Sequence, residues 1–278
     1  MKFTKMQGTG NDFILIEVRG KERDWGILAR AMCDRHFGVG ADGLVLVLPS
    51  QRADVRMRLF NADGSEAEVS GNGVRCLVKY VVERGLAAAS GRVSVEAASG
   101  LLEAEVFAEG GRVKGVRLSM GKPRFAPAEI PVVAEVEPVL DLPLDIEGQR
   151  LRVTCLSMGN PHAVFFTAQP LERYPLEQVG PRVEHHLAFP QRVNFEVARV
   201  LGRDRVELRV WERGVGETLA CGSGSCAAMV AARLHHLVGD YVDITQAGGT
   251  LTVEWDGRGE VYLTGPAEFV FEGEWPDK

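Results

Sequence analysis

A cysteine stands directly before a glycine-rich helix start in the second half of the chain. Cys221 is followed by Gly222-Ser223-Gly224 and then by the small and aliphatic run Ala227 to Leu237, which is typical of a buried helix. Glycines let the backbone approach a ligand closely, and the first amides of a helix have no internal partner. Such a helix start favours an anion and lowers the pKa of a thiol from about 8.5 toward neutrality. The stretch predicts a reactive thiolate beside a bound carboxylate or phosphate; the alternative is an inert buried thiol.

The same pattern occurs in the first half of the chain, so the sequence contains an internal repeat. Ser70 precedes Gly71-Asn72-Gly73 and a helical run, as Cys221 precedes its own glycines. The other matched segments are Gly10-Asn11-Asp12-Phe13 with Gly159-Asn160-Pro161-His162, and Asn61 to Glu66 with Glu212 to Glu217. Chance similarity of glycine turns is the alternative, but four matched features in one order argue against it. We expect two lobes facing each other across a cleft, with Ser70 on one side of a ligand and Cys221 on the other.

Two groups placed around a carboxylate indicate proton chemistry at the carbon next to that carboxylate. One group removes the α-proton from one face, and the other returns a proton to the opposite face. Helix amides would stabilise the charge that develops on the carboxylate. The sequence has no dinucleotide fingerprint, no P-loop and no Cys/His cluster with metal spacing. We therefore expect an enzyme of the racemase or epimerase class with no cofactor and no metal.

Composition limits the class of protein. A chain of 278 residues can build one large domain or two of ordinary size. Hydrophobic content of 45% and charge of 25% are those of a soluble globular protein, and the net charge of −6 argues against nucleic acid as a partner. The N-terminus lacks the apolar core of a signal peptide, and no apolar run is long enough for a membrane span. Five scattered cysteines predict thiols in a reducing cytoplasm.

Several motifs together resemble the diaminopimelate epimerase family over nearly the whole chain. They are Gly10-Asn11-Asp12-Phe13, Gly38-Val39-Gly40-Ala41-Asp42-Gly43, Asn61-Ala62-Asp63-Gly64-Ser65-Glu66, Gly71-Asn72-Gly73-x-Arg75-Cys76, Gly159-Asn160-Pro161-His162, Glu212-Arg213-Gly214 and Glu217-Thr218-x-Ala220-Cys221-Gly222-Ser223-Gly224. The resemblance implies an α/β (α+β) fold of two pseudo-symmetric lobes, each a β-sheet rolled around a central helix. We expect an N-terminal lobe over residues 1–117, completed by the C-terminal strand 266–278, and a C-terminal lobe over residues 118–265.

The resemblance also implies an activity and a set of site residues. The family interconverts LL- and meso-diaminopimelate without pyridoxal phosphate, using two cysteines on opposite sides of the α-carbon, and the second of them matches Cys221. His162 and Glu212 match residues thought to tune the two thiols. The family's substrate contacts match Asn11, Asn61, Gly71, Asn72, Asn160, Asn194, Glu212, Arg213, Gly222 and Ser223. A homodimer is implied as well.

Without the resemblance, two of these positions have simpler interpretations. His162 follows a proline at the start of an apolar strand, where a structural histidine that satisfies its own hydrogen bonds is common. Glu212 and Arg213 could form a surface ion pair of little energetic value. In a cleft, however, the Arg213 guanidinium would suit a bidentate grip on a distal carboxylate.

One departure from the family lies at the chemistry itself. Ser70 stands where the family has its first cysteine, immediately before Gly71. A serine hydroxyl is a far weaker acid than a thiol and needs a strong neighbouring base to ionise near pH 7. Three explanations stay open: an engineered Cys→Ser substitution, divergence to one-base chemistry such as dehydration or racemisation of another amino acid, or a helix cap in a catalytically silent amino-acid-binding relative. We predict that this sequence epimerises very slowly or not at all.

Overall fold

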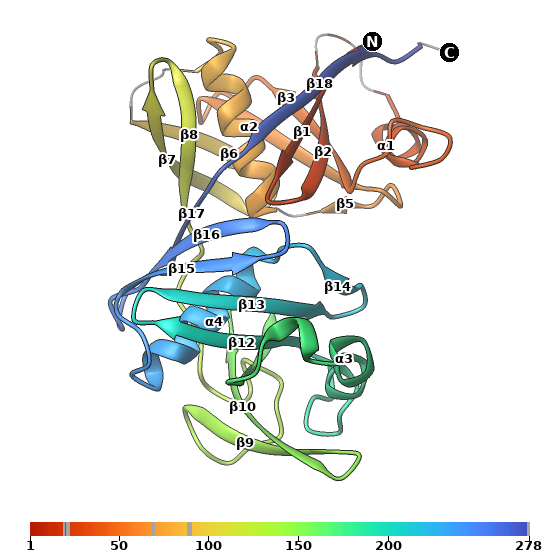
Figure 1. The fold of residues 1–278 in the computed structure, drawn as a ribbon. Helices are drawn as coiled ribbons and strands as arrows, with labels where there is room; N and C mark the ends of the chain where they lie inside the picture. The colour runs from red at the N-terminus through yellow and green to blue at the C-terminus, as the bar shows by residue number, and fades with distance from the viewer. Residues whose placement is uncertain (19, 21–22, 68–69, 88–90, 277–278) are drawn as a thin grey trace. The chain divides into compact units, whose positions relative to one another are not determined.

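The chain forms two compact units, each a β-sheet that packs on one long buried helix (Figure 1). The computed structural model describes residues 1–18, 20, 23–67, 70–87 and 91–276. Unit 1 consists of Met1–Ser119 and Thr264–Lys278, and unit 2 consists of Met120–Leu263. Strands outnumber helices in both units, and the mixed α/β class expected from the sequence is confirmed.

Unit 1 builds its sheet in the order β18–β1–β2–β3–β4–β6–β7–β8, with the short β5 beside β4. Its elements are β1 Lys2–Gly8, β2 Asn11–Glu17, α1 Trp25–Cys33, β3 Gly43–Leu48, β4 Val55–Asn61, β5 Glu66–Ala67, α2 Gly71–Glu83, β6 Arg92–Ala97, β7 Gly100–Glu109, β8 Arg112–Ser119 and β18 Glu268–Glu274. The strand β3 is apolar throughout because both of its faces are covered. Val45 and Val47 pack in the core around α2, and Leu44 and Leu46 pack in the core around α1.

Unit 2 builds its sheet in the order β9–β10–β11–β12–β13–β15–β16, with β14 beside β13. Its elements are β9 Val139–Ile146, β10 Gln149–Ser157, β11 Pro161–Phe166, η1 Leu171–Arg173, α3 Leu176–Glu184, β12 Asn194–Gly202, β13 Arg205–Glu212, β14 Gly216–Thr218, α4 Gly222–Leu234, β15 Tyr241–Gln246 and β16 Gly249–Glu254. The strand β17, Tyr262–Gly265, then carries the chain back into unit 1.

The strand pairings of the two units confirm the internal repeat that the sequence predicts. In unit 1, β1–β2 is antiparallel, β2–β3 parallel, β3–β4 antiparallel and β4–β6 parallel. In unit 2, β10–β11, β11–β12, β12–β13 and β13–β15 follow the same alternation. Even a surface ion pair is repeated: Arg58 grips Glu66 with two nitrogens, and Arg209 grips Glu217 in the same way.

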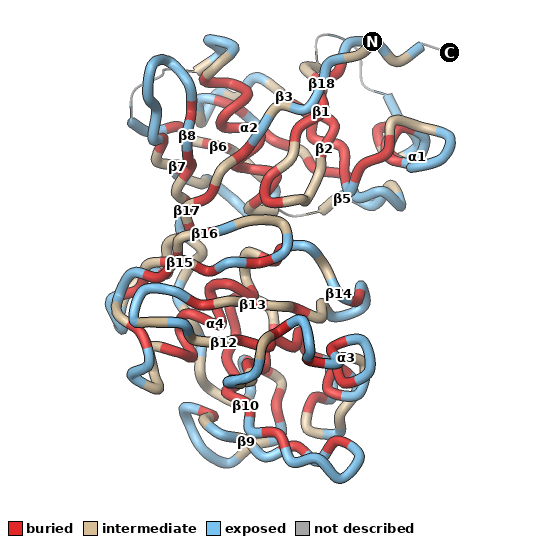
Figure 2. The backbone as a smooth tube through the Cα atoms, in the orientation of Figure 1, coloured by how far each residue is buried: buried red, intermediate tan, exposed pale blue. Residues whose placement is uncertain are grey.

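The two long helices occupy equivalent positions in their units. Each has 13 residues, and the bounds of α4 lie 151 residues after those of α2 at both ends. The glycines after Ser70 and Cys221 form the first turn of each helix, so α4 begins at Gly222, ahead of the apolar run that was expected from Ala227. Most of each helix is buried (Figure 2). In α4, alanines and glycines allow the close packing against the sheet that the core requires.

Both helices also end in the same way, with a residue in the left-handed conformation after the cap. In α2 this residue is Gly85, at φ +67°, and in α4 it is His236, at φ +58°. The amide of the next residue bonds back to the helix in each case, from Leu86 to Val81 and from Leu237 to Ala232. This arrangement satisfies the last carbonyls of the helix and is favoured by glycine.

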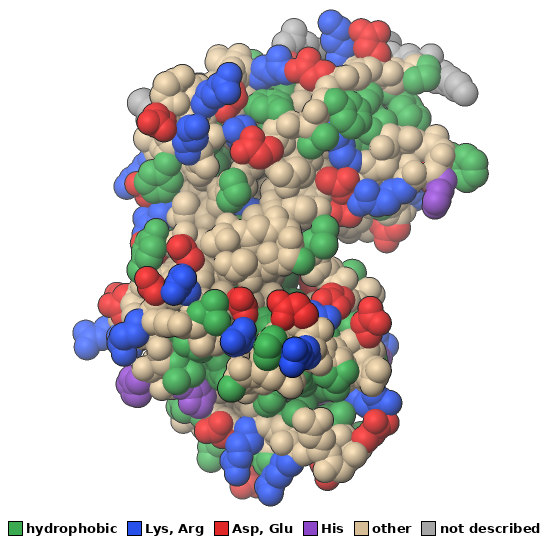
Figure 3. Space-filling view, in the orientation of Figure 1, with side chains coloured by type: hydrophobic (Ala, Val, Ile, Leu, Met, Phe, Trp, Pro, Cys, Tyr) green, Lys and Arg blue, Asp and Glu red, His purple; other side chains and the backbone are tan. Residues whose placement is uncertain are grey.

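The surface carries charges of both signs. In the face drawn in Figure 3, basic and acidic side chains are interspersed over both units. Among the described helices, none combines the length and the apolar character needed to cross a bilayer.

Candidate active site

The thiol of Cys221 caps the helix α4. Its backbone is extended, at φ −125° and ψ 117°, and its Sγ accepts a hydrogen bond from the Gly224 amide at 3.3 Å. The Ser223 hydroxyl lies 3.5 Å from the same sulfur. Behind the cap, the Gln246 side chain accepts from the Cys221 amide at 2.9 Å. These contacts fix the sulfur at the point where the free amides of the helix converge.

Gly224 has a specific reason to lack a side chain. A Cβ at this position would lie 3.1 Å from Glu196 Oε1 and 3.2 Å from Val210 Cγ2. With a larger residue at this position, Glu196 or Val210 would have to move by a few tenths of an ångström, so glycine suits the close approach of the helix start to the sheet. This close approach brings the Glu196 carboxyl directly beneath the first turn of α4.

The pKa of the Cys221 thiol differs from the sequence-based expectation. The helix start was expected to lower it toward neutrality, but burial, with 7% of the residue exposed, raises it to about 12. The negative charges of Glu212 and Glu196 act in the same direction, and hydrogen bonds from Ser223 and Gly224 offset only part of the rise. In the unliganded protein the group is a thiol at neutral pH, because desolvation outweighs the helix dipole.

Asn160, just before β11, and His162, within it, are connected to this thiol through Ser223. Asn160 donates through Nδ2 to the Ser223 hydroxyl at 3.3 Å, and its Oδ1 lies 2.9 Å from His162 Nε2. His162 is fully buried, and its Nδ1 lies 2.6 Å from Glu196 Oε1. Both ring nitrogens of His162 therefore have hydrogen-bond partners, and the ring connects a buried carboxyl to the polar residues around Cys221.

The predicted binding residues of β12 and β13 lie at the strand ends nearest the same helix start. Asn194 is paired with His162 across the parallel strands β11 and β12. Its side chain accepts from the Arg213 amide at 2.9 Å and donates to the Pro161 carbonyl at 2.8 Å. Glu212 accepts from the Thr218 hydroxyl. The guanidinium of Arg213 is exposed and donates to the Gln191 carbonyl at 3.2 Å.

In unit 1, Ser70 caps α2 with the geometry that Cys221 has on α4. Its backbone has φ −133° and ψ 124°, and its Oγ accepts from the Gly73 amide at 3.3 Å. Asn72, in the first turn, donates to Asn11 Oδ1 at 3.3 Å, and Asn72 is 7% exposed. The structure therefore brings Ser70, Gly71, Asn72 and Asn11 together. Asn61 lies at the end of β4, and its Nδ2 donates to the Ser65 hydroxyl at 3.0 Å.

A charged cluster that the sequence reasoning did not use supports Asn11. Asn11 donates to the Asp42 carboxylate, which also pairs with Arg35. Asp12 pairs with Arg35 at 2.8 Å and with Lys5 at 2.6 Å. Burial alone would raise the pKa of Asp12, but the hydrogen bonds from Arg35 and Lys5 outweigh it and lower that pKa to about 2. Asp42 belongs to the glycine-rich motif Gly38 to Gly43. A charged residue within such a motif was the sequence feature that could have indicated this cluster.

Glu196 is the other functional candidate that sequence reasoning missed. It is fully buried in β12, between the apolar residues Phe195 and Val197. Burial raises its pKa to about 7, although the neighbouring His162 opposes this rise. A glutamate within an apolar strand was the sequence feature that could have identified it, because a buried carboxyl needs a specific partner.

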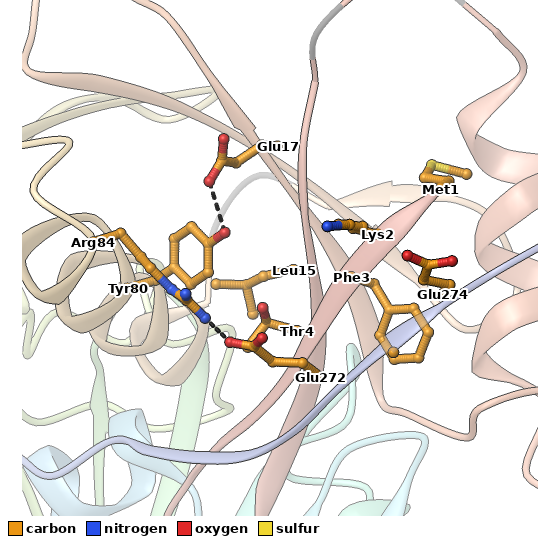
Figure 4. A pocket seen from close by; sticks show the side chains of 11 residues that line it. Met1, Lys2, Phe3, Thr4, Leu15, Glu17, Tyr80, Arg84, Glu272 and Glu274 are labelled. Atoms are coloured by element: carbon orange, nitrogen blue, oxygen red, sulfur yellow. Dashed lines mark hydrogen bonds and ion pairs between the residues drawn. The ribbon is translucent and has the colours of Figure 1, made fainter.

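A cavity of unit 1 lies away from these residues. This cavity, of about 640 Å³, lies between β1, β2, β18 and α2 (Figure 4). In it, the Tyr80 hydroxyl donates to Glu17 at 2.8 Å, and Arg84 pairs with Glu272. None of the predicted site residues lines it. Among the described residues, no group of three or more His, Cys, Asp or Glu side chains is arranged to hold a metal ion.

Comparison with solved structures identifies the fold. A PhzF-family phenazine biosynthesis protein from Bacillus anthracis superposes with a TM-score of 0.72 at 18% identity, covering 100% of this chain and 99% of the other. A probable proline racemase from Agrobacterium radiobacter superposes with a TM-score of 0.69 at 17% identity, covering 99% and 92%. At such identities the likeness shows the fold alone.

Comparison of sequences identifies the family. The family model described as diaminopimelate epimerase matches residues 3–126 and 154–270. The diaminopimelate epimerase of Pelotomaculum thermopropionicum is 50% identical over 279 aligned positions, covering 99% of both chains. That of Moorella thermoacetica is 48% identical with the same coverage. With two matching helix starts, one capped by a thiol and one by a hydroxyl, this chain belongs to the diaminopimelate epimerase family.

Proposed function

We propose that this chain is a cofactor-independent amino-acid epimerase whose substrate is LL- or meso-diaminopimelate. The observation that carries the proposal is the shared cap geometry of Cys221 and Ser70, each aligned with the free amides of a helix start. Membership of the family supports diaminopimelate as the substrate. A helix start of this kind supplies amide donors for a substrate carboxylate while charge develops on it.

In this proposal Cys221 is a base that removes or returns the α-proton on one face of the substrate carbon. A thiol with a pKa of about 12 is not ionised at neutral pH, so its ionisation must accompany substrate binding. Glu212 contributes to that high pKa through its negative charge. The α-ammonium group of the substrate, paired with Glu212, would neutralise this charge and make the thiolate easier to form.

Ser70 occupies the place of the second base. Its hydroxyl cannot be appreciably ionised near pH 7 without a strong neighbouring base, and it accepts a hydrogen bond from the Gly73 amide, which is a donor. A proton delivered to the face opposite Cys221 then has no efficient source. We therefore expect Cys221 to exchange the α-hydrogen of one stereoisomer with solvent while inversion is very slow.

Proton NMR in heavy water tests this proposal directly. The protein is incubated separately with LL- and with meso-diaminopimelate, and loss of the α-proton signal is followed apart from inversion. We expect exchange at a centre of one configuration only, without inversion. In Ser70→Cys, we expect both exchange and inversion, with inversion faster than in the unmodified chain by at least about 10³-fold. Rapid inversion by the unmodified chain would contradict the assigned role of Ser70.

A second candidate function is a catalytically silent amino-acid-binding protein of the same family. The observation that favours it is that the Ser70 hydroxyl serves as an ordinary helix cap, accepting from the Gly73 amide. The two functions separate in the same experiment. If neither the unmodified chain nor Ser70→Cys exchanges the α-hydrogen while calorimetry detects binding of the amino acid, the silent function is supported.

We also infer a homodimer and a cytoplasmic location. The family resemblance supports the dimer, and the five cysteines, all free and buried, support a reducing compartment. Sedimentation velocity of the purified protein would test the dimer, and a sedimentation coefficient of a single chain would contradict it.

A further inference from the structure

A buried carboxyl–imidazole pair lies beneath the first turn of α4. Glu196 and His162 are both 0% exposed, and Glu196 Oε1 lies 2.6 Å from His162 Nδ1. The second oxygen, Oε2, is buried and has no hydrogen-bond partner within 3.5 Å among the described residues, while the Ala163 amide lies close enough to the carboxyl to lower its pKa in part. A bare carboxylate oxygen in that position would be costly, so the surroundings favour the neutral carboxylic acid.

The partner on the other side of the ring determines where the imidazole proton lies. His162 Nε2 is 2.9 Å from Asn160 Oδ1. An amide oxygen has no proton to donate, so this contact requires a proton on Nε2. The Nδ1 atom then either accepts a proton from a neutral Glu196 or donates one to an ionised Glu196. In both cases a single proton is shared between Oε1 and Nδ1, and the pair carries no net charge.

We propose that Glu196 is a positioning residue for the Cys221 half of the site: it shares one proton with His162, which fixes the His162 ring as an Nε2–H donor to Asn160 and so holds Asn160 on Ser223. The inference rests on the proposed function for the role of Cys221. A chain of contacts connects Asn160 to the Cys221 sulfur. Asn160 donates to the Ser223 hydroxyl at 3.3 Å, and that hydroxyl lies 3.5 Å from the sulfur.

The electrostatic surroundings agree with a shared proton. Besides His162 on β11, the ionisable groups that interact with Glu196 are Glu212 on β13, Cys155 on β10 and Cys221 on α4. Glu212 bears a like charge, and a negative charge on Glu196 raises the pKa of both thiols. An ionised, unshared Glu196 would therefore make the Cys221 thiolate harder to form.

Nitrogen NMR of histidine-labelled protein tests the shared proton without any need for activity. The His162 signals are assigned with His162→Gln. We expect Nε2 to carry a proton in the unmodified chain from pH 5.5 to 8.5, and Nδ1 to show the shift of a shared proton below the pKa of Glu196, which is about 7. In Glu196→Gln, whose amide can donate to Nδ1, we expect Nδ1 to become a plain acceptor. A lone pair on Nε2, or Nδ1 signals unchanged by the substitution, would overturn the proposal.

The positioning role is tested by kinetics in the Ser70→Cys background, where turnover is expected. Glu196→Gln should lower kcat about 10-fold with little change in KM, because binding contacts stay while the orientation around the sulfur loosens. Glu207→Gln, a partly buried glutamate of the same sheet that pairs with Arg199, is the matched control and should leave kcat within about twofold. Equal effects of the two substitutions would overturn the positioning role. Absence of turnover in the Ser70→Cys background would instead count against the proposed function, while the NMR result stands by itself.

Discussion

The two helix starts share one geometry but differ in what supports them. In unit 1, Asn11 accepts from Asn72 and is held from behind by the charged cluster of Asp42, Asp12 and Arg35. In unit 2, the equivalent Asn160 donates to Ser223 and is held by His162. The first support is largely solvent-accessible, with Arg35 56% and Asp42 41% exposed, and the second is fully buried.

The difference continues one layer deeper. Phe13 and Val45 occupy in unit 1 the strand positions that His162 and Glu196 occupy in unit 2. An ionisable pair thus lies beneath the helix that Cys221 caps. Beneath the helix that Ser70 caps there is an apolar layer instead. Duplication preserved the backbone that presents a capping group, while the side chains beneath it decide what electrostatic environment that group experiences.

The largest expected effect comes from making the two caps alike. Cys221→Ser leaves a hydroxyl as the cap of both helices. We expect exchange of the α-hydrogen of diaminopimelate to fall by at least about 10³-fold, because a hydroxyl ionises far less readily than a thiol and no effective base remains. The measurement is loss of the α-proton NMR signal in heavy water. Cys33→Ala, which removes a buried thiol from unit 1, is the control. Exchange that survives in Cys221→Ser would mean that a different residue is the base.

An intermediate effect, on stability, is expected when the residues beneath α4 in unit 2 are replaced by the apolar residues that lie beneath α2 in unit 1. The triple variant His162→Phe, Glu196→Val, Leu208→Met places in unit 2 the residues found at the equivalent strand positions of unit 1. These residues are Phe13, Val45 and Met57, and Met57 packs near Gly73. Because a buried polar pair is replaced by apolar packing, we expect the free energy of unfolding at pH 8 to rise by about 1–3 kcal/mol. Urea unfolding measures it. A variant less stable than the unmodified chain at pH 8 would show that the pair is a net stabiliser.

The pH dependence of the stability of the same variant tests the direction of the Glu196 pKa shift. The pKa of Glu196 is raised from 4.5 to about 7 by folding, so the stability it contributes is fully present below pH 4.5 and is lost as the pH rises through 7. The unmodified chain should therefore lose stability relative to the triple variant between these two values. A constant difference from pH 4 to pH 8 would contradict the assigned pKa.

The smallest expected effect concerns the helix C-termini. His236 takes the left-handed conformation that Gly85 takes in the other unit. His236→Gly should stabilise the protein by up to about 1 kcal/mol, and Gly85→His should destabilise it by a similar amount, because a Cβ is strained in this conformation. Thermal unfolding followed by circular dichroism measures both. Two shifts of the same sign would show that neighbouring contacts, rather than backbone strain, dominate at these ends.

The sequence predicted the fold well where a pattern repeats. The glycine motifs after Ser70 and Cys221, and the matched strand starts at Asn11 and Asn160, were sufficient to predict two equivalent α/β units. The apolar run that predicted α4 begins at Ala227, later than the helix itself, because glycines have low helix propensity, whereas packing against the sheet selects them at the helix start.

For the site, the sequence was less informative about environment than about residue type. It named Cys221 and Ser70 from their place before the glycines, but it gave the thiol a lowered pKa where burial raises it. The error has a physical cause: the helix dipole is a local property of consecutive residues, while desolvation depends on strands that fold over the sulfur from elsewhere.

The sequence by itself determined the repeat, the capping residues and the absence of a thiol at position 70, because these depend on residue identity and spacing alone. Only the tertiary structure decided that Glu196 lies beneath Cys221, that His162 joins it to Asn160, and that Arg35 and Lys5 gather around Asp12. Those partners are distant in the chain, and their interaction energies depend on burial and on the separation of a few atoms, which no local pattern encodes.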